Sequence, residues 1–372
     1  MSAMGAVDIP NGDGKKSGVE SKHRLLGEPN PDHRPDSYDD EVEYSPLLLS
    51  SLERHLPSYL QSSSRKSKLH YMKDVLSRYF PSDFELTRVQ KHREYRERII
   101  SSYKPLHKEL YTMSPSEFFL PSFLRALDEN SEQCLESIIS QPACGIYVFD
   151  MLQPTFCEMM VSEVENFERW VHDTNIRIMR PNTMNKYGAV LDDFGLEYML
   201  HMLMDKYISP LSNVLFPDVG GSSLDSHHGF VVEYGSDRDV DLGFHVDDSE
   251  VTLNVCLGNQ FSGGDLFFRG VRCDNHLNTE TYPEEVLDYC HVPGRAVLHC
   301  GRHRHGARAT TSGRRVNLLL WCRSSIFREQ KKYRKGHYDW CGECQRNKIV
   351  RRQISIDVTA LELRKRDGIS AS

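Results

Sequence analysis

The chain has 372 residues and a formal net charge of −7 at pH 7, with 39% hydrophobic and 27% charged residues. This length suits one large domain or two modest ones and is enough for a substantial core. The modest charge gives no global case for nucleic acid binding, and no apolar run reaches the length of a membrane span.

Residues 1–65 are rich in glycine, serine, proline and charge, which predicts a disordered N-terminal region. The first ten residues lack the basic start and apolar centre of a secretory signal. We therefore expect the protein in the nucleus or the cytoplasm, with its ten cysteines reduced.

Residues 66–140 are predicted to be a helical region. Apolar side chains recur there at intervals of three and four, and Pro81 is the expected end of this first helix: Leu69, Met72, Val75, Leu76 and Tyr79. The next predicted helix is basic, with Arg88, Lys91, Arg93, Arg96 and Arg98 interleaved with Glu94 and Glu97. We expect a solvated helix with internal ion pairs, and contact with nucleic acid or an acidic tail is the alternative.

Residues 141–325 are predicted to form the main domain. A strand at Gly145–Phe149 precedes a helix from Pro154 to about His172, and Tyr198–Leu215 reads as a helix broken at Pro210. Short strands then follow glycine turns: Phe230–Tyr234, Val251–Leu257, Asp265–Phe268, Ala296–Cys300 and Val316–Cys322. This order predicts an α+β fold, a double-stranded β-helix (jelly roll) buttressed by N-terminal helices. The loop Asp274–Tyr289 is a candidate substrate lid.

His245 and Asp247 are candidate metal ligands within this domain. In an extended segment residues i and i+2 point to the same face, so both side chains could reach one ion. A second histidine must come from a distant strand, and His303 and His305 are the candidates. Two imidazoles and one carboxylate are typical of non-haem Fe(II) oxygenases, so the set favours iron without excluding zinc.

Arg315 is a candidate for binding a carboxylate. It begins the strongly apolar stretch Val316–Trp321, so we expect it to be buried, and a buried arginine needs a partner. A guanidinium grips a carboxylate through two hydrogen bonds, and a dicarboxylic acid bound to the metal at its other end would supply that group. The neighbouring Arg314 should face solvent. Asp248 is expected to be a polar neighbour of the site, and orienting a metal ligand is the alternative role.

These motifs together resemble the Fe(II)/2-oxoglutarate dioxygenases of the prolyl-4-hydroxylase type. The matching residues are His245-x-Asp247, Gly263-Gly264-x-Leu266, Pro293-Gly294, and His305 with Arg315 ten residues later. The resemblance implies Fe(II) and 2-oxoglutarate as cofactors and ascorbate as reductant. It also implies that Arg315 binds the C5 carboxylate, which selects His305 over His303. Tyr234 matches a tyrosine that helps to hold 2-oxoglutarate, and Asn254 is a weaker candidate; core packing is the alternative for both.

A second resemblance concerns Arg180–Gly188, which is similar to the plant Incurvata/Cupuliformis group of these oxygenases. That group implies a nuclear protein associated with chromatin or a Polycomb-type complex. The expected reaction is hydroxylation, or oxidative demethylation, of a nuclear protein, with a methylated histone as the first candidate. The alternatives are a prolyl or lysyl hydroxylase of a cytosolic protein and a non-catalytic chromatin adaptor.

Residues 326–372 are predicted to be a basic tail, in which a Cys-x-x-Cys pair follows the basic run. His337, Cys341 and Cys344 suggest part of a zinc site, but a full set of four ligands is not evident, and a thiol pair without metal is equally expected. The basic run could contact nucleic acid or chromatin, serve as a nuclear signal, or be solvated.

Overall fold

The structure, a computed structural model, describes residues 49, 52–53, 55–79, 83–129, 131–258, 260–333 and 338–369. The helices are α2 Ser58–Gln61, α3 Arg65–Tyr79, α4 Asp83–Ser102, α5 Pro115–Phe118, α6 Pro121–Glu129, α7 Glu132–Ile138, α8 Pro154–Thr174, α9 Glu197–Met202, α10 Ser209–Leu215, α11 Ser325–Tyr333 and α12 Gly342–Ile369. The strands are β1 Ser140–Ala143, β2 Ile146–Asp150, β3 Gly188–Val190, β4 Ser226–Gly235, β5 Leu242–His245, β6 Val251–Cys256, β7 Phe261–Gly263, β8 Leu266–Val271, β9 Val286–Tyr289, β10 Arg295–Cys300, β11 His303–Ala307 and β12 Thr310–Arg323.

Two antiparallel sheets form the centre of the molecule. The larger has the order β1-β2-β10-β6-β12-β4-β3, with β7 also paired to β12, and the smaller has the order β5-β11-β8-β9. Apolar residues of β2 and β10 pack against Leu266 and Phe268 of β8 and Ala307 of β11, so the inner faces of the two sheets share a core. This arrangement confirms the predicted jelly-roll core.

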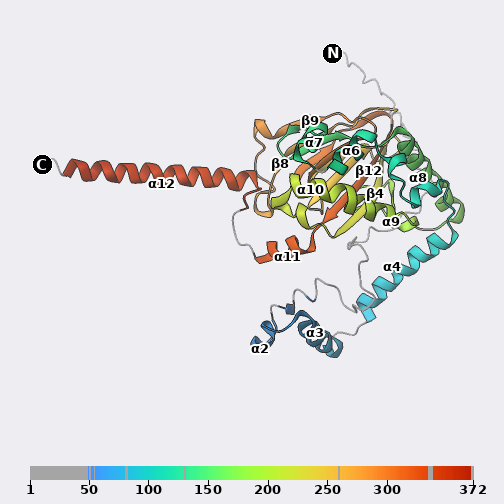
Figure 1. Cartoon of the computed structure of the whole chain (residues 1–372), viewed down its shortest axis with the longest axis horizontal. Coiled ribbons are helices and arrows are strands. Elements are labelled where there is room, and N and C mark those ends of the chain that lie inside the picture. The colour runs from blue at the N-terminus through green and yellow to red at the C-terminus, as the bar shows by residue number, and fades with distance from the viewer. Residues whose placement is uncertain are drawn as a thin grey trace, which may run out of the picture.

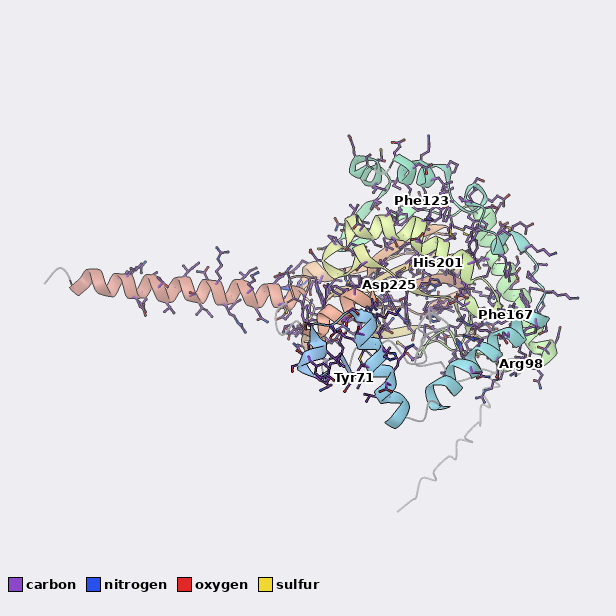
Figure 2. The ribbon with its side chains drawn as sticks, turned by 60° about the horizontal axis from the view of Figure 1, so that its bottom comes forward. Tyr71, Arg98, Phe123, Phe167, His201 and Asp225 are labelled. Carbon is purple, nitrogen blue, oxygen red and sulfur yellow. The ribbon has the colours of Figure 1, made fainter. Side chains whose placement is uncertain are left out.

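The outer face of the larger sheet is covered by helices. The long helix α8 buries one face, with Phe156, Met160, Val164, Phe167 and Val171 at helical spacing, in the same cluster as apolar residues of β6, β10 and β12. Figure 1 shows α9 and α10 over β4 and β12, and Figure 2 shows Phe123 of α6 and Phe167 of α8 within this helical layer. The predicted helical buttress is therefore present.

Side chains of β12 point alternately to the helix-covered core and to the space between the two sheets. Leu318 and Leu320 join the helical core, whereas Leu319 packs with β4 residues on the opposite face. Arg315, Asn317 and Leu319 share that inner face because side chains alternate along a strand. The fold thereby directs a charged and an amide side chain into the space between the sheets.

The helix predicted to break at Pro210 does not break. Its backbone runs from α9 through the π-helical segment η3, Leu203–Ile208, into α10, where Pro210 occupies the first turn. Proline is tolerated in a first turn, and the preceding change of helical type accommodates its missing N–H group.

The basic helix α4 is also less solvated than predicted. The side chain of Arg96 lies 3.4 Å from Asp193 and 3.6 Å from Asp192, both of which are buried, and the hydroxyl of Tyr95 donates to Asp193 at 2.8 Å. The middle of α4 therefore anchors this helix to the domain. Residues 80–82, including the predicted helix end at Pro81, lie outside the described residues.

Residues 1–48 of the predicted disordered region also lie outside the described part. Near the end of the predicted disordered region, however, Ser58–Gln61 forms α2. Leu49 and Leu56 of the same region pack against Met72 and Leu76 of α3. Ser64 accepts a hydrogen bond from the backbone N–H of Ser67 at 3.2 Å and so caps the start of α3.

The C-terminal segment ends in a long helix. Figure 1 and Figure 2 both show α12 extending away from the body of the molecule. Several of its apolar side chains are more than half exposed, among them Ile349, Val350 and Ile354. None of the helices in the described ranges combines the length and apolar composition needed to cross a membrane.

Candidate functional site

The predicted metal ligands come from the smaller sheet. His245 ends β5, and its Cα pairs directly with that of His305 on β11. Asp247 follows two residues after His245, where its backbone N–H donates to the carbonyl of Gly301 at 2.9 Å. Strand pairing and this hydrogen bond bring together three residues that are 60 positions apart at most.

The three side chains, here called the metal set (His245, Asp247 and His305), converge. The Nε2 atom of His245 lies 3.5 Å from Oδ1 of Asp247, and the Nε2 atom of His305 lies 3.6 Å from Oδ2. The ligand atoms all lie within 4.8 Å of one another. His303 does not join them, because its Nε2 accepts a hydrogen bond from the backbone N–H of Gly270 at 3.2 Å.

The two imidazoles of the metal set are oriented by backbone carbonyls. Nδ1 of His245 lies 2.7 Å from the carbonyl oxygen of Gly243, and Nδ1 of His305 lies 2.8 Å from that of His303. A carbonyl oxygen can only accept, so each Nδ1 carries the proton and donates it. Each Nε2 lone pair is thereby left free for a metal, as is usual for ligating histidines.

The charge state of the metal set also suits a cation. Burial opposes ionisation of Asp247, but His305, His245 and His299 together hold its pKa below the ordinary value. Burial lowers the pKa of His305 to about 3, so this imidazole is neutral at pH 7. Oδ2 of Asp247 accepts from the hydroxyl of Thr252 at 2.7 Å, whereas the buried Oδ1 makes no hydrogen bond within the described part of the chain. This orphaned oxygen, beside two lone pairs, fits a bound divalent metal.

A further histidine beside the metal set was not predicted. His299 of β10 is fully buried, and its Nε2 lies 4.0 Å from Oδ2 of Asp247. Its Nδ1 lies 2.9 Å from the carbonyl oxygen of Cys300, which fixes the ring. The signal was available, because His299 is a polar residue on the inward-facing side of an otherwise apolar predicted strand.

Arg315 occupies the other predicted part of the site. It is 1% exposed, and its guanidinium carbon lies 4.0 Å from the ring centroid of Tyr234, its direct partner across β12 and β4. Its Nη1 donates to the carbonyl oxygen of Gly264, but its Nε makes no hydrogen bond and it forms no ion pair with any described residue. A buried guanidinium in this condition is suited to an anionic ligand.

One cavity is lined by all of the predicted site residues. His245, Asp247, His305, Arg315, Tyr234 and Asn254 all contribute to its wall. Apolar side chains, including Val232, Leu266 and Leu319, line the rest. We call its polar part away from the metal the anion pocket (Arg315, Tyr234, Asn254 and Asn317). The metal set and the anion pocket therefore face the same cavity.

Two asparagines of this cavity were missed as functional residues. Nδ2 of Asn185 donates to the hydroxyl of Tyr234 at 3.1 Å, and Nδ2 of Asn317 donates to Oδ1 of Asn254 at 2.6 Å. Burial raises the pKa of Tyr234, so its phenol stays protonated and can donate in turn to a carboxylate. Asn317 could have been found from its position two residues after Arg315 on the same face of one strand.

The glycine pair before β8 is explained by Arg315. Gly264 has φ = +75°, and an added Cβ atom would lie 3.2 Å from Cδ and Nε of Arg315 and 2.9 Å from Oγ1 of Thr310. Its carbonyl oxygen accepts the hydrogen bond from Arg315. The site thus requires a residue without a side chain at this position.

Two predictions about the surroundings need correction, those for Arg314 and for the segment Asp274–Tyr289. Arg314 faces away from the cavity as expected, but it is not simply solvated, because it pairs with Glu165 and lies 3.1 Å from the buried Glu233. Asp248 pairs with Arg323 and Arg328. The predicted loop Asp274–Tyr289 is not irregular throughout, since its last four residues form β9 and pair with β8. The proposed lid role of this segment remains a prediction.

Comparisons with known proteins point to one family. A family model described as an OGFOD2-like domain matches residues 99–221. The chain is 59% identical over 350 residues to the 2-oxoglutarate and iron-dependent oxygenase domain-containing protein CP2 of Arabidopsis thaliana, covering 94% of this chain and 89% of that protein. It is 57% identical over 341 residues to the correspondingly named protein ICU11 of the same plant, covering 91% and 86%.

Among solved structures, the chain is similar to a prolyl 4-hydroxylase structure from Phytophthora capsici. The sequence identity is 14%, the match covers 58% of this chain and 70% of that chain, and the TM-score is 0.38.

Proposed function

The chain belongs to the 2-oxoglutarate- and iron-dependent oxygenases, in the group of the Arabidopsis proteins CP2 and ICU11, and from this premise we propose which residues carry its activity. It is an enzyme that uses Fe(II) and 2-oxoglutarate, for which ascorbate is a typical reductant. We propose that the metal set binds Fe(II) and that Arg315 binds the far carboxylate of 2-oxoglutarate. The observation that carries this proposal is that one cavity is lined both by the metal set and by a buried arginine that has no anionic partner among the described residues.

The metal supplies the redox chemistry when it is bound with 2-oxoglutarate and oxygen. The protein supplies position. Gly243 and His303 hold the two imidazoles by their Nδ1 protons, and Thr252 orients the carboxylate of Asp247. The metal set would supply three ligands to Fe(II), and the remaining coordination positions would be available to 2-oxoglutarate and oxygen.

The anion pocket orients the co-substrate. Arg315 has two nitrogens available for a carboxylate once Nη1 has bonded to Gly264, and Tyr234 covers one guanidinium face. The phenol of Tyr234 accepts from Asn185 and can donate to the same carboxylate. The apolar side chains in the rest of the lining lower the local polarity, which strengthens each of these interactions.

The prime substrate that we propose is a nuclear protein, with a methylated histone as the first candidate in chromatin repression. The support is the resemblance of Arg180–Gly188 to the Incurvata/Cupuliformis group and the high identity to CP2 and ICU11. The side chain of His245 is 13% exposed, so the metal end of the cavity is the part that a protein side chain could approach. A cytosolic prolyl or lysyl hydroxylase would use the same site.

Peptide turnover tests the proposed substrate. The protein is incubated with Fe(II), 2-oxoglutarate, ascorbate and one of three kinds of peptide: methylated histone peptides, their unmethylated forms or proline-containing peptides. The masses of the products are then measured by mass spectrometry. Loss of a methyl group with release of formaldehyde supports demethylation, and gain of one oxygen atom identifies hydroxylation. Modification of the proline peptides alone would contradict the histone proposal.

The adaptor alternative needs a different comparison. A non-catalytic chromatin adaptor has no need of the metal set, so His305→Ala should then retain full cellular function. Loss of cellular function in His305→Ala, in a protein that still folds, supports the enzyme.

A further inference from the structure

A second group of ligand-type side chains lies outside the cavity. Cys273 and His276 follow β8, whereas Cys341 and Cys344 stand at the start of α12, and the fold brings the two pairs together. We call these four residues the thiol cluster. The chain thus supplies the two partners that the Cys-x-x-Cys pair lacked in the sequence. His337, the histidine suggested by the sequence, lies outside the described residues.

The distances within the thiol cluster fit one tetrahedral ion. Nδ1 of His276 lies 3.3 Å from Sγ of Cys273, 3.6 Å from that of Cys341 and 3.5 Å from that of Cys344. The sulfurs of Cys273 and Cys344 are 3.9 Å apart. With Zn–S bonds of about 2.3 Å and Zn–N bonds of about 2.0 Å, tetrahedral angles give S···N separations of about 3.5 Å and S···S separations of about 3.8 Å.

Packing alone does not account for this arrangement. Buried cysteines often behave as small apolar side chains, and here Tyr338 and Trp340 do cover the three sulfurs. Packing gives no reason, however, for one imidazole nitrogen to lie within 3.6 Å of all three. The cysteines are free thiols, so the cluster is not a disulfide bond.

We propose that the thiol cluster binds one zinc ion in a structural site. Three thiolates and one imidazole form a closed set of four, which is the composition of structural rather than catalytic zinc sites. The metal set differs from the thiol cluster in the type and the number of its ligands, since the metal set contains a carboxylate, no sulfur and only three ligands. Soft sulfur ligands favour zinc at the thiol cluster, and the mixed nitrogen and oxygen ligands suit iron at the metal set.

The proposed zinc ion joins the beginning of the candidate lid to the start of α12. On α12, Arg346 stacks on the ring of Tyr282 at 3.5 Å and pairs with Glu284 at 2.8 Å. On the other side, the fully buried Arg272, next to Cys273, forms two 2.7 Å hydrogen bonds with Glu285. Zinc would therefore hold the start of α12 against the segment Asp274–Tyr289.

Elemental analysis of the purified full chain tests the proposal. Protein produced in zinc-supplemented medium and dialysed against a chelator should retain about one zinc per chain. Cys344→Ser and Cys273→Ser should lose it, whereas Cys144→Ser, which changes an exposed cysteine outside the cluster, should keep it. His305→Ala should keep it too, because that substitution affects only the metal set, and a failure of the iron assignment is thereby distinguished from a failure of this one.

Cobalt substitution of the wild-type chain gives a second readout that needs no variant. Bound Co(II) should show thiolate charge-transfer bands and the intense ligand-field bands of a tetrahedral site. Modification of the thiols should release the ion in step with the loss of these bands. Wild-type protein without zinc, zinc retained by Cys344→Ser and Cys273→Ser, or a cobalt spectrum without thiolate bands would overturn the proposal.

Discussion

At the scale of single residues, the site depends on side chains held by their neighbours rather than by a ligand. Arg315 is fixed on both sides, by Gly264 through a hydrogen bond and by Tyr234 through its ring. Asn185 in turn fixes the hydroxyl of Tyr234. A pocket organised in this way loses little conformational entropy when an anion binds.

Tyr234→Phe removes the hydroxyl of Tyr234 but keeps its aromatic ring, so it measures the contribution of the hydroxyl alone. The phenylalanine ring still stacks on Arg315, but the hydrogen bonds of the phenol are lost, which costs about 1 kcal/mol. We expect KM for 2-oxoglutarate to rise up to about tenfold, with kcat little changed, in a succinate assay. Asn185→Ala should raise KM by a similar factor. Because the two residues share one hydrogen bond, the double variant should lose less binding free energy than the sum of the losses in the two single variants. An unchanged KM in Tyr234→Phe would exclude the hydroxyl from co-substrate binding.

His227 makes the stability of the fold sensitive to acid. Burial, with help from His201, Arg96 and Arg323, lowers its pKa from 6.5 to about 4. The unfolded chain therefore takes up this proton first as the pH falls, so the contribution of His227 to stability is lost progressively from about pH 7 to pH 4. Between pH 7 and pH 5 the loss is about 2 kcal/mol.

Urea unfolding at the two pH values measures this effect. In His227→Gln the side chain does not titrate, so the difference in the free energy of unfolding between pH 7 and pH 5 should shrink by about 2 kcal/mol relative to wild type. An equal pH dependence in both proteins would show that His227 is not protonated on unfolding.

At the scale of elements, short apolar runs predicted the strands that face the helices but not the two strands that carry the candidate metal ligands His245 and His305. β4, β6, β10 and β12 are rich in apolar residues, so their pattern was visible in the sequence. β5 and β11 contain only four and five residues, with glycine, histidine and arginine among them. Strand pairing within the folded sheet, rather than local propensity, makes them strands.

Gly264→Ala tests the contact between the glycine turn and Arg315. The positive φ disfavours alanine by about 1–2 kcal/mol, and the new methyl group would press on Arg315 and Thr310. We expect a lower Tm together with a higher KM for 2-oxoglutarate. Gly243→Ala is the control for stability, because a methyl group there meets no atom within 4 Å, and its Tm should stay at the wild-type value. Equal Tm and KM in wild type and Gly264→Ala would contradict the packing argument.

At the scale of the whole molecule, the limits of sequence reasoning lie in long-range proximity. The family motif identified His245, Asp247, His305 and Arg315, and the fold brings these residues to one cavity. The partners of Cys344 could not be identified in this way, because His276 lies 68 residues away and no local pattern connects them. The same holds for Asn185 and Tyr234, which are 49 residues apart.

Truncation separates the two ends of α12. A chain that stops after residue 348 loses the exposed part of the helix but keeps Cys341 and Cys344, so its Tm and its succinate formation should match the full chain. A chain that stops after residue 340 loses both cysteines and the start of α12, and its Tm should fall because the thiol cluster can no longer bind its proposed metal ion. A lower Tm in the longer of the two truncated chains would show that the distal helix packs on the domain.

The most direct test of the central claim is succinate formation from 2-oxoglutarate by the purified protein with Fe(II) and ascorbate. Wild type should form succinate, whereas His245→Ala and Arg315→Ala should not. Arg314→Lys, at the adjacent position whose side chain pairs with Glu233 outside the cavity, should remain active. Activity of Arg315→Ala equal to wild type would contradict its assignment to 2-oxoglutarate. Absence of succinate from wild type, together with no binding of 2-oxoglutarate to the iron-loaded protein, would contradict the oxygenase site as a whole.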